Sequence, residues 1–333
     1  MTKSEIAVLG AGSWGTALAI LLAQNGHTVK LWARRAGHAA EMNRSRTNAR
    51  YLPNHKLPPA LTVTSDMGEA LRGGRVVVCA IPSRYCRETF QQMLPHGRPD
   101  ACYVSATKGI EVGTLKRISE ILRETLPEQV KIVVLSGPSF AVESVQGHPT
   151  AVVASSEDSS AAEHVQNIFS SARFRVYTNN DVVGTEVGGA VKNVIAIAAG
   201  LVTGLGFGSN TIAGLITRGL AEVCRLAGAM GGRRETLGGL AGLGDLVLTC
   251  TGPLSRNREA GIKLAQGFTI EQVQQATPMS IEGIPTTRAT LELGRKYGVE
   301  MPITEQVYRV LYDGKAPQAA ISDLMERRLK EEF

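Results

Sequence analysis

The sequence predicts an α/β protein in which an N-terminal, doubly wound parallel sheet is followed by an all-α C-terminal domain. Two observations support this prediction. A glycine-rich turn joins an apolar run to an amphipathic run close to the N-terminus, which is how such sheets commonly begin. Clusters of β-branched residues then alternate with helical stretches until about residue 177, after which Ala, Leu, Gly and helix-period patterns prevail. We therefore expect a sheet domain at residues 1–186 and a helical domain at residues 187–333.

Six strands are expected in the first half of the chain, each a short apolar or β-branched run that ends in a loop. They cover Ile6–Leu9, Val29–Trp32, Val76–Ala80, Ala101–Ser105, Lys131–Leu135 and Thr150–Ala154. Three of the following loops, at residues 81–83, 106–109 and 136–140, are rich in small and polar residues. Ligands of open parallel sheets bind beyond the carboxyl ends of the strands, so these loops are expected to line one crevice.

The second half is expected to be a set of helices, with the change of character near residues 184–188. Helical periodicity predicts Gly189–Thr203, Asn210–Gly228, Arg256–Gln266, Ile270–Ala276, Gly283–Tyr297, Ile303–Tyr312 and Ala316–Leu329. The first of these resembles a membrane span in composition. Lys192 and Asn193 near its start, with glycines through and after it, favour a buried core helix instead, so no integral membrane segment is expected.

The glycine-rich turn Gly10-Ala11-Gly12-Ser13-Trp14-Gly15 matches the G-x-G-x-x-G pattern of Rossmann-like sheets. In that setting Gly10 allows the tight turn, Gly12 lets the backbone approach a pyrophosphate, and Gly15 permits close packing of the helix. The bound anion then faces unpaired N–H groups at the helix N-terminus. The pattern alone also fits an ordinary glycine-rich turn, but its place between a strand and a helix favours dinucleotide binding.

The end of the second strand bears on which dinucleotide is bound. A cofactor without a 2′-phosphate is usually held there by an acidic residue, about twenty residues after the glycines. The strand runs instead into Ala33-Arg34-Arg35. Arginine pairs bidentately with phosphate oxygens, so the sequence favours NADPH and NADP over NADH and NAD, with Arg34 the favoured contact. The alternative is that Arg34 and Arg35 are solvated loop residues without a phosphate partner. Both arginines would also tolerate NADH.

Composition and charge narrow the class of protein. The chain has 333 residues, 43% hydrophobic and 20% charged, which suits a globular protein with a sizeable core. Its net charge of +6 is scattered, without a basic run interleaved with aromatics. This favours anionic small molecules over nucleic acid, with a solvated surface as the alternative.

Cysteines, histidines and the N-terminus add three further expectations. The five cysteines form no C-x-x-C pair, which argues against a disulfide framework or a zinc site, and they are expected to be buried and reduced. The six histidines lack metal-ligand spacing, so no metal is expected. Because a strand is expected from Ile6 on, no signal peptide is expected, and the location is expected to be cytoplasmic.

Lys192 is the only charged residue between Glu186 and Arg218, and its neighbours are aliphatic. Desolvation disfavours an ammonium in such surroundings and lowers its pKa toward the range useful for proton transfer, which makes Lys192 a candidate acid and base. The alternative is a lysine at a helix start that snorkels to water. Asp245 lies in an apolar, glycine-rich setting and needs a partner, for which Lys192 is the natural candidate.

The tetrapeptide Ser255-Arg256-Asn257-Arg258 follows Gly252-Pro253 and is expected to open a helix. Hydroxyl, guanidinium, amide and free backbone N–H groups together suit a phosphate. An isolated tetrapeptide of this kind is also a common helix cap with a solvated face.

These motifs together resemble those of the soluble, bacterial-type NAD(P)-dependent glycerol-3-phosphate dehydrogenase family. The segments that carry the resemblance run through the whole chain and are Gly10–Ala17, Ala106–Glu111, Ser136–Glu143, Glu186–Asn193, Gly242–Leu246, Ser255–Asn257 and Ile281–Gly283. The resemblance implies reversible reduction of dihydroxyacetone phosphate to sn-glycerol 3-phosphate for glycerophospholipid synthesis. It also implies a homodimer.

The resemblance assigns roles to matching positions. Lys192 corresponds to the proton-transferring lysine, and Asp245 assists it. The substrate contacts are expected to be Lys108, Gly137, Ser139, Lys192, Asp245, Thr249, Ser255, Arg256 and Asn257. The expected cofactor contacts include the glycines and arginines named above. They are Gly10, Gly12, Ser13, Trp14, Gly15, Arg34, Arg35, Lys108, Ala141, Arg256 and Glu282. Gly188-Gly189 departs from the bulkier or more polar residues expected there, which puts the local helix start in question.

The residue patterns and the resemblance converge on one mechanism. We expect hydride to pass from the nicotinamide C4 to the carbonyl carbon while the Lys192 ammonium protonates the carbonyl oxygen, and we expect neutral Lys192 to take the hydroxyl proton in the reverse direction. Lys108 is expected to lower the pKa of Lys192, and Asp245 to raise it. Rival hypotheses are a β-hydroxyacid dehydrogenase or ketopantoate reductase and, in another class, a redox-sensing protein that binds NADPH without turnover.

Overall fold

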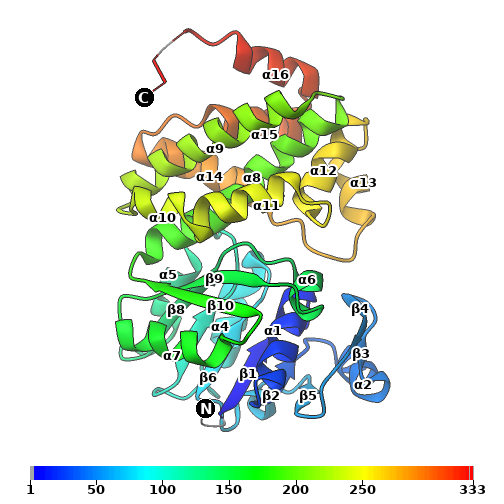
Figure 1. Cartoon of the computed structure of the whole chain (residues 1–333), viewed down its shortest axis with the longest axis vertical. Helices are drawn as coiled ribbons and strands as arrows, with labels where there is room; N and C mark the ends of the chain where they lie inside the picture. Colours follow the sequence, from blue (N-terminus) through cyan, green and yellow to red (C-terminus); the bar gives the residue numbers. More distant parts are fainter. Residues whose placement is uncertain (1–3, 330, 333) are drawn as a thin grey trace.

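The computed structural model describes residues 4–329, 331 and 332, and it divides into a sheet domain and a helical domain. In Figure 1 the sheet domain lies below and the helical domain above, with the N-terminal end of the chain at the bottom and the C-terminal end at the top. The predicted fold class is confirmed. Helix α8 (Val182–Gly204) carries the chain from one domain into the other, and the expected boundary between residues 186 and 187 falls inside it.

Eight strands form one sheet in the order β10-β9-β8-β7-β6-β1-β2-β5. Their bounds are β1 (Glu5–Leu9), β2 (Thr28–Trp32), β5 (Leu61–Thr64), β6 (Val76–Cys79), β7 (Cys102–Ser105), β8 (Lys131–Ser136), β9 (Thr150–Ser155) and β10 (Phe174–Asn179). The six strands expected from the sequence are confirmed to within a residue at each end. The edge strands β5 and β10 and the small hairpin of β3 (Thr47–Asn48) and β4 (Leu52–Lys56) were not predicted.

The sheet is not wholly parallel, which corrects the expectation of a parallel sheet. Strands β9 and β10 are parallel to each other, but β9 pairs with β8 in the antiparallel sense. The physical reason lies in the connection after β8, which contains only the short helix α6 (Ala141–Val145), packed against α1 (Ser13–Gln24). The chain leaves β8 at the carboxyl ends of the strands and enters β9 from that same side, so β9 runs antiparallel to β8.

Helices cover both faces of the sheet, because successive residues of a strand point to opposite faces. Ile6 and Val8 of β1 belong to the core shared with α1 and α7 (Ser159–Phe169), whereas Ala7 and Leu9 belong to the core shared with α4 (Cys86–Met93) and α5 (Ile118–Thr125). Strands β6 and β7 are buried along their whole length, as the continuous apolar runs of doubly covered strands should be. The remaining helices of this domain are α2 (Ala36–Ser45), α3 (Met67–Leu71) and the single 3₁₀ turn η1 (Ser83–Tyr85).

Helix α8 is the axis of the helical domain and contacts α9, α11, α12, α14 and α15. The other helices are α9 (Ser209–Ala229), α10 (Arg234–Gly238), the π-helical turn η2 (Leu240–Gly244), α11 (Asp245–Thr251), α12 (Arg256–Ala265), α13 (Ile270–Gln275), α14 (Gly283–Tyr297), α15 (Pro302–Tyr312) and α16 (Pro317–Met325). The seven expected helices are confirmed, although the last ends at Met325 rather than at Leu329. Helices α10 and α11 and the π-helical turn were not predicted.

Helix α8 begins at Val182, seven residues before the expected start. Asp181 caps it, because its side chain accepts a hydrogen bond from the Gly184 N–H at 2.9 Å. Gly188 and Gly189 therefore lie inside the helix. A Cβ on Gly188 would lie 2.7 Å from the Ala241 carbonyl oxygen, and one on Gly189 would lie 2.7 Å from Ser136 Oγ. The two glycines let α8 approach both the π-helical turn and the end of β8.

The apolar character of α8 reflects burial within the protein. It is long and apolar enough to cross a membrane, yet 89% of its most apolar window is buried, as expected for a core helix. Glu186 ties it to the sheet domain, because its carboxylate accepts hydrogen bonds from Arg117 Nη1 and from the Ser119 N–H, both at 2.8 Å. These bonds hold the helix over the carboxyl edge of the sheet. Of the cysteines, four are buried and Cys224 is half-buried, as expected for reduced core residues.

Candidate active site

The two domains meet over the carboxyl ends of the strands, where the sequence predicts a crevice. Lys108 lies in the loop after β7, and Gly137 directly follows β8. Lys192 projects from α8, and Asp245 and Thr249 lie one turn apart on α11. Hydrogen bonds join these five residues into one polar cluster, which we call the lysine–aspartate cluster.

Lys192 is 6% exposed, and its ammonium has two partners inside the helical domain. Its Nζ donates to Asp245 Oδ1 at 2.5 Å and to Thr249 Oγ1 at 2.7 Å. Burial lowers the pKa of Lys192 to about 8, although the Asp245 carboxylate acts in the opposite direction, and the Lys108 charge lowers it further. Lys192 is therefore paired with Asp245, as the sequence analysis predicts, and does not snorkel to water.

Asp245 is shared between two lysines. Its Oδ2 accepts a hydrogen bond from Lys108 Nζ at 2.6 Å, and Lys108 Nζ also donates to the Gly137 carbonyl oxygen at 2.8 Å. Burial alone would raise the pKa of Asp245, but the charges and hydrogen bonds of Lys108 and Lys192 outweigh it, so the pKa is lowered. With both lysines protonated, the cluster carries one net positive charge, which suits an oxygen atom that gains negative charge.

A chain of asparagine side chains links the cluster to the start of α14. The Gly283 N–H donates to Asn257 Oδ1 at 2.9 Å, Asn257 Nδ2 donates to Asn193 Oδ1 at 2.9 Å, and Asn193 Nδ2 donates to the Lys108 carbonyl oxygen at 3.4 Å. Asn257 was expected in the site. Asn193 was not, although it directly follows Lys192; a polar amide beside the lone lysine of an apolar helix is the signal that points to it.

Ser255 and Arg256 lie at the N-terminus of α12, beside Asn257. Ser255 caps the helix, because its hydroxyl accepts a hydrogen bond from the Arg258 N–H at 3.2 Å. The exposed Arg256 side chain donates to the Ser280 carbonyl oxygen at 2.8 Å. The tetrapeptide is thus a helix cap, as the alternative interpretation has it, and through Asn257 it is also joined to the chain of asparagine side chains that reaches Lys108.

The loop after β8 is shaped around a glycine with left-handed geometry. Gly137 has φ +134°, and a Cβ there would lie 2.9 Å from Val152 Cα, so only glycine fits without strain. Its carbonyl oxygen accepts hydrogen bonds from Lys108 Nζ and, at 3.0 Å, from Ser139 Oγ. The structure therefore brings Ser139 beside Lys108, as expected.

The glycine-rich turn has the geometry that a pyrophosphate cradle requires. Gly10 has φ +109°, and a Cβ there would collide with the Ala80 carbonyl oxygen, while one on Gly15 would collide with the Gly10 carbonyl oxygen. By contrast, nothing lies within 4 Å of a Cβ placed on Gly12, so backbone there is open to a ligand. The residues present thus fit a dinucleotide at the N-terminus of α1.

The side chains of this turn contact segments far along the chain. The Ser13 hydroxyl donates to the Tyr51 carbonyl oxygen and lies 3.4 Å from Met279 Sδ. Trp14 Nε1 is buried without a hydrogen-bond partner among the described residues. Ala141, the first residue of α6, packs against the same core as α1.

The two arginines after β2 point in different directions. The exposed Arg34 guanidinium lies 5.0 Å from the centre of the Tyr85 ring. Tyr85 belongs to the segment that follows β6. Arg35 Nη2 donates instead to the Tyr51 hydroxyl at 3.3 Å. Tyr51 and Tyr85 were not predicted as site residues, because nothing in the sequence shows which distant aromatic rings the arginines meet.

Glu282 joins the helical domain to the loop after β6. Its Oε2 accepts hydrogen bonds from Ser83 Oγ at 2.6 Å and from the Ser83 N–H at 3.2 Å, and its Oε1 accepts one from Ser280 Oγ at 2.8 Å. A Cβ on Gly109, next to Lys108, would lie 2.6 Å from Ser83 Cβ. Glu282, Ser83 and the Lys108 loop are thus packed together, although Ser83 was not predicted.

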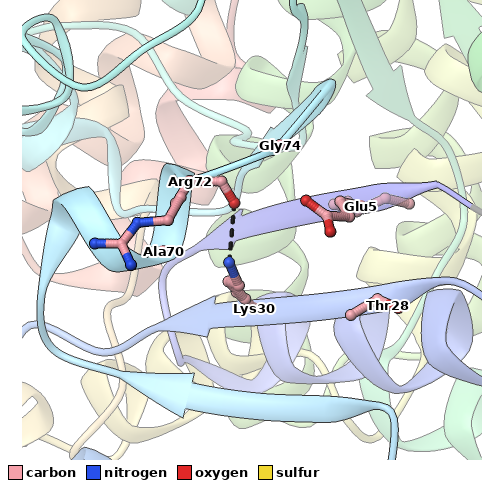
Figure 2. A pocket seen from close by; sticks show the side chains of 7 residues that line it. Glu5, Thr28, Lys30, Ala70, Arg72 and Gly74 are labelled. Atoms are coloured by element: carbon pink, nitrogen blue, oxygen red, sulfur yellow. Dashed lines mark hydrogen bonds between the residues drawn. The ribbon is translucent and has the colours of Figure 1, made fainter.

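A separate small pocket lies at the amino ends of strands β1 and β2, away from the carboxyl ends where the cluster lies (Figure 2). It is lined by residues at the starts of β1 and β2 and after α3, among them Glu5, Thr28 and Arg72. Lys30 Nζ donates across it to the Arg72 carbonyl oxygen at 2.9 Å. Because ligands of such sheets bind at the carboxyl ends, this pocket is not a candidate for the site.

Comparisons with known proteins agree with this geometry. Residues 5–162 match the family model of the NAD-dependent glycerol-3-phosphate dehydrogenase N-terminus, and residues 181–322 match that of the C-terminus. The glycerol-3-phosphate dehydrogenase [NAD(P)+] of Citrifermentans bemidjiense is 52% identical over 98% of both chains. That of Bacillus subtilis is 48% identical over 97% of this chain and 94% of its own.

Solved structures give the same result. The crystal structure of glycerol-3-phosphate dehydrogenase from Coxiella burnetii superposes with a TM-score of 0.95 at 43% identity, covering 98% of this chain and 99% of that one. A ketopantoate reductase from Ralstonia eutropha superposes with a TM-score of 0.59 at 18% identity, which shows only a shared fold.

Proposed function

The chain belongs to the NAD-dependent glycerol-3-phosphate dehydrogenase family and is an NAD(P)-dependent oxidoreductase. From this premise we propose that it catalyses the reversible reduction of dihydroxyacetone phosphate to sn-glycerol 3-phosphate, and that the lysine–aspartate cluster carries out this reaction. The observation that carries the proposal is the position of Lys192. It is a buried ammonium with a lowered pKa, at the edge of the sheet where the dinucleotide turn lies.

In the direction of reduction, Lys192 Nζ holds the proton that the carbonyl oxygen of the substrate needs. The bound NADPH or NADH supplies the hydride to the carbonyl carbon. Asp245 and Thr249 fix the direction of the Lys192 ammonium, and Lys108 adds a second positive charge beside the oxygen. In the direction of oxidation, neutral Lys192 accepts the hydroxyl proton.

The groups around the cluster fit the rest of a small phosphorylated substrate. The N-terminus of α12 offers the Arg256 guanidinium, the Asn257 amide and helix N–H groups to the phosphate. Ser255 supports this site as the helix cap, while Gly137 and Ser139 border the Lys108 side. We assign these six residues, with Lys192, Asp245 and Thr249, to substrate binding.

The cofactor is assigned to the glycine-rich turn and the segments around it. Gly10, Gly12 and Gly15 shape the turn, Ser13 and Trp14 lie on it, and Ala141 packs beside it. Arg34 and Arg35 follow β2 and favour NADPH over NADH. Lys108, Arg256 and Glu282 complete the assignment on the side of the helical domain.

Initial rates with dihydroxyacetone phosphate test this function, measured with NADPH and with NADH separately. The proposal predicts turnover with both cofactors and a higher kcat/KM with NADPH. A panel that includes ketopantoate and 2-keto acids serves as the control. Turnover restricted to those substrates would assign the chain to the rival reductases, and NADPH binding without any turnover would favour a sensor.

Two wider features belong to the same proposal. A cytoplasmic enzyme of this kind would supply glycerophospholipid synthesis with its backbone, and we expect it to act as a homodimer. Sedimentation or light scattering of the purified chain tests the assembly, and a monomer at micromolar concentration would contradict it.

A further inference from the structure

The loop after β6 carries an arginine that the assignments above leave out. Arg84 is exposed, and its guanidinium lies 4.7 Å from the centre of the Tyr85 ring, the same ring that Arg34 approaches to 5.0 Å. The two guanidinium carbons are therefore within about 10 Å of each other. Arg34 follows β2 and Arg84 follows β6, the two strands that flank β1 and its glycine-rich turn.

These two positive charges are not compensated within the part of the chain that the structure describes. Among residues 4–329, 331 and 332, the ion pairs involve neither Arg34 nor Arg84. Two exposed positive charges within about 10 Å of each other both attract an anion that binds near them. Stacking on one ring also limits the directions in which both guanidiniums point.

The neighbouring Arg35 does not take this place. Sequence adjacency suggests Arg34 and Arg35 as the pair, but Arg35 donates to the Tyr51 hydroxyl, on the β3–β4 hairpin. The second guanidinium near Arg34 therefore comes from a residue fifty positions further along the chain.

We propose that Arg84 is a specificity-determining residue that, with Arg34 beside the same Tyr85 ring, binds the 2′-phosphate of NADPH. This inference rests on the proposed function in that it takes the dinucleotide to lie over the glycine-rich turn. A 2′-phosphate carries nearly two negative charges and several acceptor oxygens, which match two planar guanidiniums. NADH lacks this group, so it gains nothing from Arg84.

The test is binding of two cofactor fragments by calorimetry, adenosine 2′,5′-bisphosphate and 5′-AMP, to the full chain and to Arg84→Gln. Arg84 is exposed, so the variant should fold. We expect about a 10-fold or greater loss of affinity for adenosine 2′,5′-bisphosphate, the usual cost of losing a charged hydrogen-bonding partner, and a change below about 2-fold for 5′-AMP. The ratio of kcat/KM with NADPH to that with NADH should fall in parallel.

Arg175→Gln is the matched control, because Arg175 stacks on Tyr177 at 5.2 Å in the far edge strand β10. It should leave both affinities unchanged. Equal losses for both fragments in Arg84→Gln, or no loss for either, would overturn the proposal. So would a wild-type chain that does not distinguish the fragments. Binding is measured without turnover, so absence of activity with dihydroxyacetone phosphate would refute the proposed function alone.

Discussion

Lys192 is the residue on which the proposed chemistry depends. A single lysine in an apolar helix either reaches water or remains buried with a partner, and only the second case tunes its pKa toward neutrality. Burial, Asp245 and Thr249 decide between the two here. Burial brings the pKa of Lys192 to about 8 against the opposing charge of Asp245, a value that suits the proposed donation and acceptance of a proton near physiological pH.

The pKa of Lys192 sets the pH dependence of both directions of the reaction. Because the pKa is lowered to about 8, the ammonium needed for carbonyl reduction is present below that pH and is lost above it. The kcat/KM for reduction should therefore fall as pH rises through about 8, and the kcat/KM for oxidation should rise, because kcat/KM follows the pKa of the free enzyme. Initial rates at low substrate concentration across pH 6–10 measure both limbs.

Asp245→Asn tests the electrostatic part of this account. The Asp245 charge opposes the lowering of the pKa of Lys192, so its removal should move the reduction limb to lower pH as well as reduce kcat. Thr249→Val keeps the charge and should leave the limb in place. A limb that stays fixed in Asp245→Asn would mean that a different group titrates.

At the scale of elements, α8 depends on two glycines that depart from the residues expected at the start of this helix. A Cβ on Gly188 would meet the Ala241 carbonyl oxygen at 2.7 Å and Leu237 Cδ1 at 3.1 Å, and a backbone atom cannot rotate away. Gly188→Ala should therefore destabilise the protein by about 1–3 kcal/mol through overpacking, despite the better helix propensity of alanine. Urea unfolding measures the change.

Gly214 of α9 is the control for this prediction, because nothing lies within 4 Å of a Cβ placed there. Gly214→Ala should stabilise the protein, by at most about 1 kcal/mol. A Gly188→Ala variant as stable as Gly214→Ala would show that α8 and the π-helical turn do not pack as closely as described.

Helix α15 is capped by a buried carboxylate from α9. Glu222 accepts hydrogen bonds from the Ile303 N–H at 2.6 Å and the Thr304 N–H at 3.3 Å, and burial raises its pKa to about 7. The folded state therefore keeps a proton that the unfolded chain, with an ordinary carboxyl pKa of 4.5, has already lost. The stabilisation of the folded state by this proton is fully present below pH 4.5 and is lost as pH rises to about 7.

Glu222→Gln removes that proton equilibrium while keeping an acceptor for the helix N–H groups. Relative to the variant, the wild-type protein should lose up to about 3 kcal/mol of stability as pH rises from about 4.5 to about 7. Urea unfolding at several pH values measures the difference. A constant difference between the two proteins over this range would contradict the raised pKa.

At the scale of the whole molecule, the sequence predicts most of the fold because its signals are local. Short β-branched runs and helical periodicity locate the strands of the sheet and the long helices, and the lone Lys192 and Asp245 point to each other. The direction of β9 could not be predicted, because it follows from the packing of α6 against α1. Nor could the contacts of Ser83 with Glu282, or the approach of Arg34 and Arg84 to one tyrosine ring, since these residues are far apart in the chain.

The central claim is that Lys192 moves the proton while other residues bind the cofactor, and Lys192→Ala separates the two most directly. Asp245 stays paired with Lys108 in this variant, so no buried charge is left alone. We predict that calorimetry finds NADPH affinity within about 3-fold of the wild-type value, while kcat for dihydroxyacetone phosphate falls by about 10²–10⁴-fold, as for loss of a general acid. Near-normal turnover in a variant that binds NADPH normally would contradict the account.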